Sequence, residues 1–290
     1  MTKVVDAHLH LFRTHRPEHP RTTYATMAEA DREELAERLL VAMEEAGVDH
    51  AVVVPLSKED HYLREVLTRF PGTFGGIGFY YHTRPDGVAA LRERLDLTPM
   101  NGLRFYGLGA TPDTTPETLA CYPVLEMMAE LGLIMWFYGD RVQLDLLDVI
   151  LDRLPSLRVV MNHSAFLPDI TAEMRVDEFK RPHFDVELPP PGLVAVERMA
   201  ARHPSLHVHF SGQYAFSKEP YPYLDLKGVA ERLHRAFGAD RMLMASDWPW
   251  IEFEPGYQRV LAVVDHLLPD ITPVERAAIR GGTAARLFGF

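Results

Sequence analysis

Cysteine, long apolar runs and positive charge are all scarce in this chain, and each shortage excludes a class of protein. Cys121 is the only cysteine among 290 residues, so no disulfide can form within the chain, which favours a reducing, cytoplasmic setting. No apolar stretch reaches the ~18 residues of a membrane span, and polar residues from Asp6 on interrupt the N-terminus where a signal peptide would be apolar. The formal net charge of −11 argues against nucleic acid or an anionic membrane as a partner. We expect a soluble protein that acts on a small molecule.

Eight short β-rich runs alternate with helical segments along the chain. Most are continuous apolar runs, as expected of strands buried on both faces, and the helical segments carry apolar residues at three- and four-residue spacing. This alternation implies right-handed parallel crossovers. It predicts an α/β fold with one domain over residues 1–290, a single (β/α)8 TIM-type barrel with its active site at the C-terminal ends of the strands. The predicted strands are Val4–His10, Ala51–Pro55, Thr73–Tyr80, Gly102–Tyr106, Leu133–Tyr138, Arg158–His163, Leu206–Phe210 and Met242–Asp247. Helices are predicted over residues 31–46, 118–131, 144–154, 193–202 and 226–237.

A doubly wound open sheet is the alternative fold, but its glycine-rich phosphate-binding fingerprint is missing after the early strands. The segment G-G-I-G at residues 75–78 lies inside a strand-like run and does not open a helix. We expect no organic cofactor. Residues 164–191 are interpreted as one long loop after the sixth strand, and no linker divides the chain.

Two histidines follow the first apolar run, in the motif D-A-H-L-H at residues 6–10. In a strand, residues i and i+2 point to the same face, so these imidazoles converge on one volume suited to metal ligation or to polarising a carbonyl. Barrel closure places the eighth strand, which ends at Asp247, beside the first, and the sixth strand ends at His163. We predict a shared catalytic site of His8, His10, His163 and Asp247. The alternatives are a hydrogen-bonded loop histidine at position 163 and a structural N-cap at position 247.

Arg104, Tyr106 and Tyr138 lie at the ends of the fourth and fifth strands and are our candidate substrate-binding residues. Arg104 and Tyr106 share a face if their strand alternates. An inward arginine would clamp a carboxylate or another oxyanion, and the alternative is a salt bridge on the outer rim. Trp136 and Phe137 are interpreted as barrel core, whereas a buried Tyr138 phenol needs a polar partner. The substrate is therefore expected to be small and anionic.

Three other features of the sequence have simpler interpretations. A second H-x-H, at His207 and His209, lies farther from the end of its strand and is assigned to the core or to an interface. Cys121 is assigned as a small buried hydrophobe in preference to a nucleophile. The loop over residues 12–27 lies on the active-site side and is a candidate lid, and the aromatic segment 214–223 leaves a homo-oligomer open.

These motifs together resemble the amidohydrolase superfamily, and within it the amidohydrolase-related (amidohydrolase 2) family and its lactonase-like branch. That family includes metal-dependent decarboxylases and sugar- or muconate-type lactonases. The resemblance covers nearly the whole chain, and it implies that His8 and His10 hold a divalent metal with Asp247 as ligand or general base. It rests on D-A-H-L-H (6–10), G-L-R (102–104), N-H (162–163), F-S-G (210–212), S-D-W-P (246–249) and G-T-A-A-R-L-F-G (282–289).

The chain departs from the family pattern in the fifth strand. Metal-dependent members usually present a histidine there, and this chain has M-W-F-Y at residues 135–138. No lysine or glutamate ends the fourth strand, so a bridged binuclear site is not expected. Two alternatives stay open. One divalent ion, with zinc as the first choice, would be bound by His8, His10, His163 and Asp247, or histidines would polarise the carbonyl without a metal, as in some members of the lactonase branch.

The main functional hypothesis is a hydrolase that opens a lactone, a cyclic carboxylic ester of a carboxylated or sugar-derived small molecule. Asp247 would take a proton from water, while His8, His10 and His163 would stabilise the oxyanion directly or through one metal ion. The alternative is a zinc-dependent decarboxylase or hydratase of an aromatic or unsaturated carboxylic acid, and a third hypothesis is a non-catalytic barrel that binds a ligand. Substrate selection is expected in the loops over residues 12–27, 81–86, 164–191 and 213–225.

Overall fold

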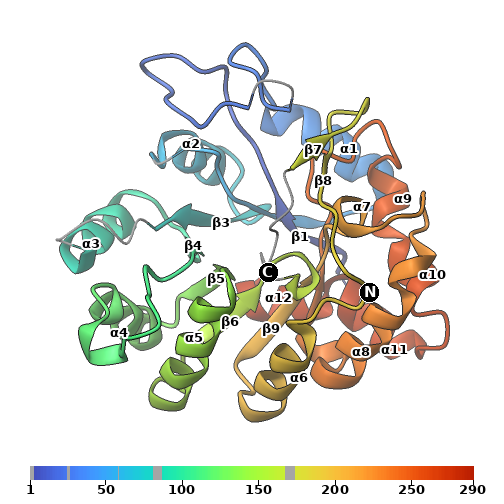
Figure 1. The fold of residues 1–290 in the computed structure, drawn as a ribbon. Coiled ribbons are helices and arrows are strands. Elements are labelled where there is room, and N and C mark those ends of the chain that lie inside the picture. The colour runs from blue at the N-terminus through green and yellow to red at the C-terminus, as the bar shows by residue number, and fades with distance from the viewer. Residues whose placement is uncertain (1–2, 25–26, 58, 81–86, 167–173) are drawn as a thin grey trace.

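The computed structural model describes residues 3–24, 27–57, 59–80, 87–166 and 174–290. Eight parallel strands form the barrel, paired in the order β1-β2-β3-β4-β5-β6-β9-β10 (Figure 1). A parallel bridge between Leu9 and Trp248 joins β1 to the segment that follows β10. The predicted (β/α)8 TIM-type barrel is therefore confirmed. The strands are β1 (Val5–Leu9), β2 (His50–Val53), β3 (Phe74–Phe79), β4 (Gly102–Tyr106), β5 (Ile134–Tyr138), β6 (Arg158–Met161), β9 (Leu206–Phe210) and β10 (Met242–Met244).

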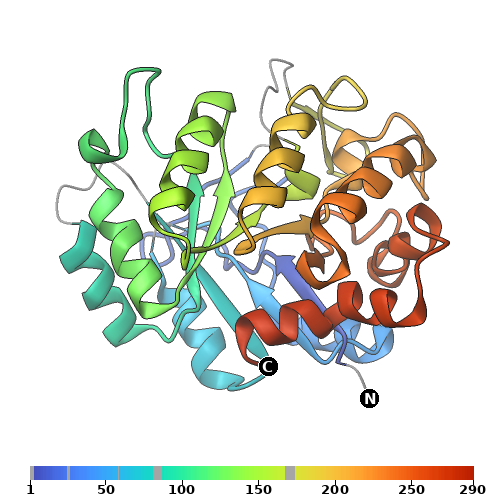
Figure 2. The same cartoon turned by 90° about the horizontal axis from the view of Figure 1, so that it is seen from below.

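Helices surround the strands on the outside of the barrel, and the last helix crosses the end at which both chain termini lie (Figure 2). The helices on the outside follow their strands in sequence, as right-handed crossovers require. They are α1 (Ala36–Ala46), α2 (His61–Arg69), α3 (Gly87–Leu97), α4 (Tyr122–Leu131), α5 (Arg141–Arg153), α6 (Leu193–Arg202) and α8 (Lys227–Phe237). Shorter helices are α7 (Gln213–Phe216), α9 (Tyr257–Leu261), α10 (Val263–Leu267), α11 (Pro273–Ala277) and α12 (Thr283–Phe288). Within the described residues no helix is both long and apolar enough to cross a bilayer.

Two predicted helices begin later than their sequence patterns indicate. The helix predicted from residue 31 begins at Ala36, because Glu34 pairs with Phe12 through reciprocal backbone hydrogen bonds of 2.7 and 2.9 Å. The helix predicted from residue 118 begins at Tyr122, and Pro116–Thr118 forms a separate 3₁₀ turn. In the first place backbone pairing with a distant segment replaces the predicted first turn of the helix. In the second place a separate 3₁₀ turn replaces it.

The segment over residues 164–191, interpreted as one long loop, contains a short antiparallel hairpin. Its strands are β7 (Arg175–Val176) and β8 (Pro182–His183). Each of these strands has only two residues, which is too short for an alternating apolar pattern to be recognised in the sequence. Two parts of the predicted specificity loops, residues 81–86 and 167–173, lie outside the described residues.

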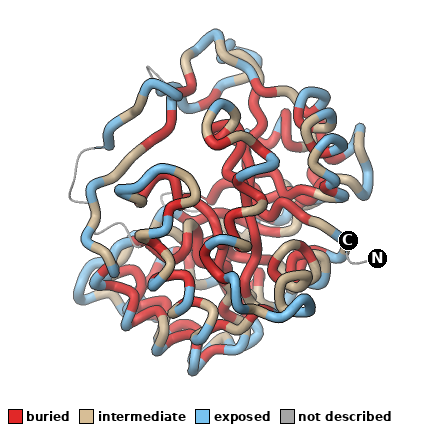
Figure 3. Tube along the Cα trace, turned by 90° about the vertical axis from the view of Figure 1, so that its right-hand side faces the viewer, coloured by how far each residue is buried: buried red, intermediate tan, exposed pale blue. Residues whose placement is uncertain are grey.

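Hydrocarbon fills the barrel at the N-terminal ends of the strands. Val5, Ile77, Ile134, Val160 and Leu243 are at most 1% exposed and form one cluster inside the barrel. The cluster is closed from below by α12 through Leu287 and Phe288. In Figure 3 the trace is red, the colour of buried residues, through the strands and tan or pale blue over much of the outer helices. This end supplies the rigid base above which the polar residues are placed.

A register shift in β1 changes which of its side chains face the barrel interior. Val5 and Asp6 pair with His50 and Ala51 of β2, but Leu9 pairs with Val53, so β1 carries one extra residue between Asp6 and Leu9. A bulge of this kind re-aims the side chains that follow it. His8 consequently points inward, although Val5 and Ala7 below it also belong to the inner cluster.

Candidate active site

Backbone contacts hold Asp247 beside the H-x-H strand. Beyond β10 the Asp247 N–H donates to the His8 carbonyl at 2.9 Å, and the His10 N–H donates to the Trp248 carbonyl at 2.7 Å. Asp247 has φ = +63°, in the left-handed region that non-glycine residues rarely adopt. Such a conformation persists where surrounding contacts fix it, and it is common at functional sites.

A second carboxylate, Asp6, ties the same two chain segments together from below. Asp6 is fully buried and accepts hydrogen bonds from Ser246 N (2.8 Å), Ser246 Oγ (2.5 Å) and Tyr257 Oη (3.0 Å). Burial raises the pKa of Asp6 to about 6, against the lowering effect of these donors. Asp6 fixes the residue that precedes Asp247, so it positions the candidate site without lining its pocket.

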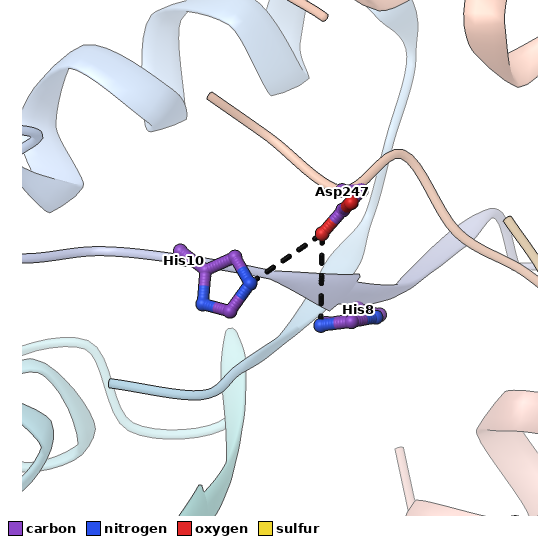
Figure 4. A group of neighbouring side chains, drawn as sticks. All are labelled: His8, His10 and Asp247. Atoms are coloured by element: carbon purple, nitrogen blue, oxygen red, sulfur yellow. Dashed lines mark ion pairs between the residues drawn. The ribbon is translucent and has the colours of Figure 1, made fainter. Parts of the chain in front are cut away.

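His8, His10 and Asp247 converge on one point (Figure 4). Asp247 Oδ1 lies 3.4 Å from His10 Nε2 and 3.7 Å from His8 Nε2. The three side chains are buried, and one ligand atom from each lies within 4.8 Å of the other two. The structure therefore brings these three predicted residues together, and the fourth, His163, lies 3.9 Å from the other oxygen of the Asp247 carboxylate.

The contact of His10 Nδ1 with a backbone carbonyl shows which nitrogen of the ring faces Asp247. His10 Nδ1 lies 3.1 Å from the Val54 carbonyl. A carbonyl can only accept, so Nδ1 carries the hydrogen and the Nε2 lone pair of a neutral ring faces the Asp247 carboxylate. Asp247 Oδ1 is buried and has no hydrogen-bond donor among the described residues. Two facing lone pairs need a proton on Nε2 or a cation between them.

Two separations among the three ligand atoms match those around a small divalent cation, and the third is at most 4.8 Å. Ligands about 2.1 Å from a tetrahedral zinc ion are about 3.4 Å from each other, close to the 3.4 and 3.7 Å separations found here. Burial lowers the pKa of His8 well below its ordinary value, so its ring is neutral and can donate a lone pair. The donor set of two imidazoles and one carboxylate is typical of zinc.

Two further residues contact the other oxygen of the Asp247 carboxylate. The buried Tyr214 hydroxyl, from α7, donates to Oδ2 at 2.6 Å. His163 Nδ1 lies 3.9 Å from Oδ2 and 3.4 Å from Ser211 Oγ, and burial lowers the pKa of His163 to about 4. Burial disfavours the ionised Asp247, but His163, His10 and Tyr214 outweigh it and hold the pKa of this carboxyl well below its ordinary value. Asp247 is thus an ionised, fixed acceptor at neutral pH.

Arg104 lies inside the barrel and not on its outer rim. It is 3% exposed, its Nη1 lies 3.4 Å from His8 Nε2, and its guanidinium stacks on the Tyr106 ring at 4.6 Å. With the Asn162 amide oxygen turned toward it, that oxygen accepts from Nε and Nη2 at 3.1 and 3.2 Å. Among the described residues no carboxylate lies within 4.0 Å of the guanidinium, so the charge of Arg104 is not neutralised by the protein around it.

These groups form the floor of a cavity of about 140 Å³ at the C-terminal ends of the strands. His10, Arg104, His163 and Asp247 all line it. Its walls are mainly aromatic and aliphatic, and include the two other predicted substrate-binding residues, Tyr106 and Tyr138. The wall residues outside the barrel strands are Tyr24, Met27, Leu56, Met174, Pro182 of β8, Phe184, Tyr214, Ala215 and Phe216 of α7, and Trp250.

The family model for the amidohydrolase family matches residues 5–290 of this chain. The chain belongs to the amidohydrolase family. This confirms the expectation of a hydrolase of that family, and it agrees with the placement of the H-x-H motif and Asp247 at the C-terminal ends of the barrel strands.

Individual relatives of the chain include one curated enzyme and several solved structures. An L-fucono-1,5-lactonase from Burkholderia ambifaria is 25% identical over 261 residues, which cover 86% of this chain and 81% of that protein. A zinc-bound amidohydrolase structure from Burkholderia multivorans matches with a TM-score of 0.74 and 19% identity, covering 99% of both chains. A structure described as a putative 2-pyrone-4,6-dicarboxylic acid hydrolase from Pseudomonas putida matches with a TM-score of 0.72 and 22% identity, covering 100% of this chain and 98% of that one.

The fifth strand, which departs from the family pattern by having no histidine, places Trp136 beside the site. The Trp136 ring packs edge-on against His8 with centroids 4.8 Å apart and is fully buried. The assignment of Trp136 to the barrel core is confirmed. It is the core residue that packs directly against His8 of the site.

Sequence reasoning missed the closeness of His209 to the site. His209 is fully buried, as a core residue should be, and its ring stacks on His8 with centroids 5.3 Å apart. Tyr214 was noted only as part of an aromatic loop. Its contact with Asp247 depends on how the loop after β9 folds, for which the sequence offered no signal.

The candidate lid after β1 forms a wall of the pocket through Tyr24 and Met27. The buried Arg21 guanidinium fastens this loop, because it donates hydrogen bonds to six backbone carbonyls, those of residues 13, 22, 28, 29, 30 and 32. One side chain thus supplements the few backbone hydrogen bonds of the loop, such as those between Tyr24 and Ala28. Residues 25–26 of the loop lie outside the described residues.

Proposed function

We propose that the chain is a lactonase that opens a small cyclic ester bearing an anionic group. The observation that carries the proposal is the Asp247 carboxylate, which is ionised, fixed by Tyr214 and aimed between the Nε2 atoms of His8 and His10. It lies in a pocket beside a buried arginine that has no carboxylate partner among the described residues. The names of the L-fucono-1,5-lactonase and the 2-pyrone-4,6-dicarboxylic acid hydrolase among its relatives support the same reaction class.

In the proposed reaction Asp247 accepts a proton from water while the water oxygen bonds to the lactone carbonyl carbon. The tetrahedral oxyanion is stabilised by the imidazoles of the site, with the ring of His163 as a neutral donor. The ring C–O bond then breaks, and the proton held by Asp247 passes to the departing alkoxide. The product is a hydroxy acid, which contains the atoms of the lactone and one water.

A divalent ion at this site would be held by His8, His10 and Asp247, and it would supply Lewis-acid polarisation of the lactone carbonyl. Zinc is the first choice because the donors and their spacing suit it. Without an ion, the His8 Nε2 lone pair accepts from Arg104 Nη1 at 3.4 Å, and a proton on His10 Nε2 faces Asp247.

A panel of lactones tests the proposed function. Purified chain, with its metal content measured per polypeptide, is assayed by proton release, and ring-opened products are identified by NMR. We expect hydroxy-acid formation from at least one anionic lactone. Carbon dioxide release from an aromatic acid, with no lactone opened, would overturn the proposal in favour of a decarboxylase.

Chelation decides between the two versions of the mechanism. If one zinc ion per chain is functional, activity falls on removal of the ion and returns on addition of zinc. Activity that is unchanged in metal-free protein would assign carbonyl polarisation to the imidazoles and Arg104.

A further inference from the structure

We infer that the substrate of this site, on the proposed lactonase function, is a single-ring lactone that carries one carboxylate and otherwise presents apolar surface. Four features of the pocket lead to this inference. Arg104 has no carboxylate partner among the described residues, and the neighbouring arginines are paired with other carboxylates. The walls are mainly apolar, and the cavity is small.

Arg104 supplies one positive charge to the pocket and no more. It is the only arginine or lysine among the described residues that line the cavity. Its Nε and one N–H of Nη2 are used by Asn162, and one N–H of Nη1 faces His8. One N–H remains on each terminal nitrogen, which matches the two oxygens of one carboxylate. A buried guanidinium without a counter-ion is costly, so an anionic ligand is favoured here.

Two other arginines that lie beside wall residues, Arg32 at Trp250 and Arg181 near Tyr214, are already engaged. Arg32 pairs with Glu34 at 2.7 Å and donates to the Met27 carbonyl at 2.7 Å. Arg181 pairs with Asp177 at 2.8 Å and donates to the carbonyl of Glu254 at 2.8 Å. A second carboxylate on the substrate would therefore be desolvated without a partner. It would also approach the ionised Asp247, which repels it.

The walls offer little to a substrate rich in hydroxyl groups. No serine, threonine, asparagine or glutamine is among the described residues that line the cavity. The wall hydroxyls are the phenols of Tyr24, Tyr106, Tyr138 and Tyr214. The Tyr214 hydroxyl is committed to Asp247, and Tyr106 has half its surface exposed, so few hydroxyls face a buried ligand. Met27, Leu56 and Phe216 supply hydrocarbon instead. Specific sites hold each polar group of a ligand with a matching partner, so a flat, apolar ring fits better than a polyol.

The cavity is small and opens to solvent on one side. A cavity of about 140 Å³ is smaller than the ~300–1,000 Å³ of pockets for drug-sized ligands. It accommodates one ring with a small substituent.

Kinetics with matched lactones test the inference. The probes are a 2-pyrone monocarboxylate, 2-pyrone-4,6-dicarboxylate, unsubstituted 2-pyrone and L-fucono-1,5-lactone. We expect kcat/KM for the monocarboxylate to exceed each of the others by at least about tenfold. A preference for the dicarboxylate, the polyol or the neutral ring would overturn the inference while leaving the lactonase function intact.

A charge added at the mouth should change this selectivity in a defined direction. Met174 lines the pocket and is 38% exposed, so Met174→Arg can be accommodated. We expect the ratio of dicarboxylate to monocarboxylate kcat/KM to rise at least about fivefold in Met174→Arg and to stay within about twofold of wild type in Met174→Gln. Equal ratios in the two variants would contradict the assignment of charge as the limiting factor.

Ligand binding separates this inference from the proposed function. If no lactone is hydrolysed, the proposed function fails, and calorimetry with benzoate and isophthalate still measures the preference for one carboxylate. Tighter binding of benzoate, lost in Arg104→Met, supports the inference on its own. Equal or tighter binding of isophthalate overturns it.

Discussion

The lower half of the barrel interior, at the N-terminal ends of the strands, is hydrocarbon packed against hydrocarbon, whereas the upper half is polar and only partly satisfied. Below lie Val5, Ile134 and the residues clustered with them over α12. Above lie His8 and Asp247, each with a buried polar atom that has no hydrogen-bond partner among the described residues. The same strands contribute to both halves. Burial of apolar surface stabilises the fold below, and unsatisfied groups above are available to a ligand.

Asp247→Asn should produce the largest effect, in the upper half. An amide cannot take the proton from water, so we expect kcat to fall by about 10²–10⁴-fold, with an unfolding midpoint below that of wild type at neutral pH because the folded state favours the ionised carboxylate. Asp270→Asn, at an exposed position, is the matched control. More than a tenth of wild-type kcat in Asp247→Asn would remove this residue from the role of base.

Ile134→Ala is the corresponding change in the lower half. Ile134 is 1% exposed within the inner cluster, so truncation should lower the free energy of unfolding by about 2–5 kcal/mol. Denaturant unfolding measures this loss. Well below the unfolding midpoint kcat/KM should remain within about threefold of wild type. A tenfold loss of kcat in folded protein would show that the two halves are not separable.

Tyr214→Phe tests whether the hydrogen bond from Tyr214 to Asp247 contributes to catalysis. The variant removes the 2.6 Å hydrogen bond to Asp247 Oδ2 and little volume. A hydrogen bond to a charged group contributes about 1.5–3 kcal/mol, so kcat should fall about 10- to 100-fold while KM changes less than about threefold. A change confined to KM would assign Tyr214 to substrate binding instead.

Asp6 lies between the two halves of the barrel interior, and Asp6→Asn should change the stability of the protein in a way that depends on pH. The pKa of Asp6 is raised by burial from 3.8 to about 6 in the folded protein, so the folded state binds the proton more tightly than the unfolded state. Wild type should therefore lose stability relative to Asp6→Asn as pH rises from about 4 to about 6, by up to about 3 kcal/mol, with a constant difference above that range. Parallel denaturation curves at several pH values measure it. A difference that is independent of pH would mean that Asp6 titrates normally.

The sequence allowed the lower half of the barrel to be predicted more completely than the upper half. All eight barrel strands were predicted, and β4 and β9 have the predicted bounds, because a buried strand carries its apolar pattern locally. The convergence of His8, His10 and Asp247 also followed, from the rule that chemistry lies at the C-terminal ends of the strands. The membership in the amidohydrolase family was likewise predicted from those motifs.

What the sequence did not predict depends on pairing between distant segments. The bulge in β1 is defined only against β2, and the stacking of His209 on His8 follows from where the two strands lie across the barrel. Tyr214 reaches Asp247 from a four-residue helix whose position is fixed by the loop around it. Local patterns carry no information about such contacts.

Hydrolysis of an anionic lactone in oxygen-18-labelled water, under single-turnover conditions, tests the central claim most directly. If Asp247 directs water to the carbonyl carbon, one labelled oxygen appears in the carboxylate of the ring-opened product, and Asp247→Asn with the same metal content gives no product on that time scale. Label in the alcohol oxygen, or equal product formation by Asp247→Asn, would contradict the account.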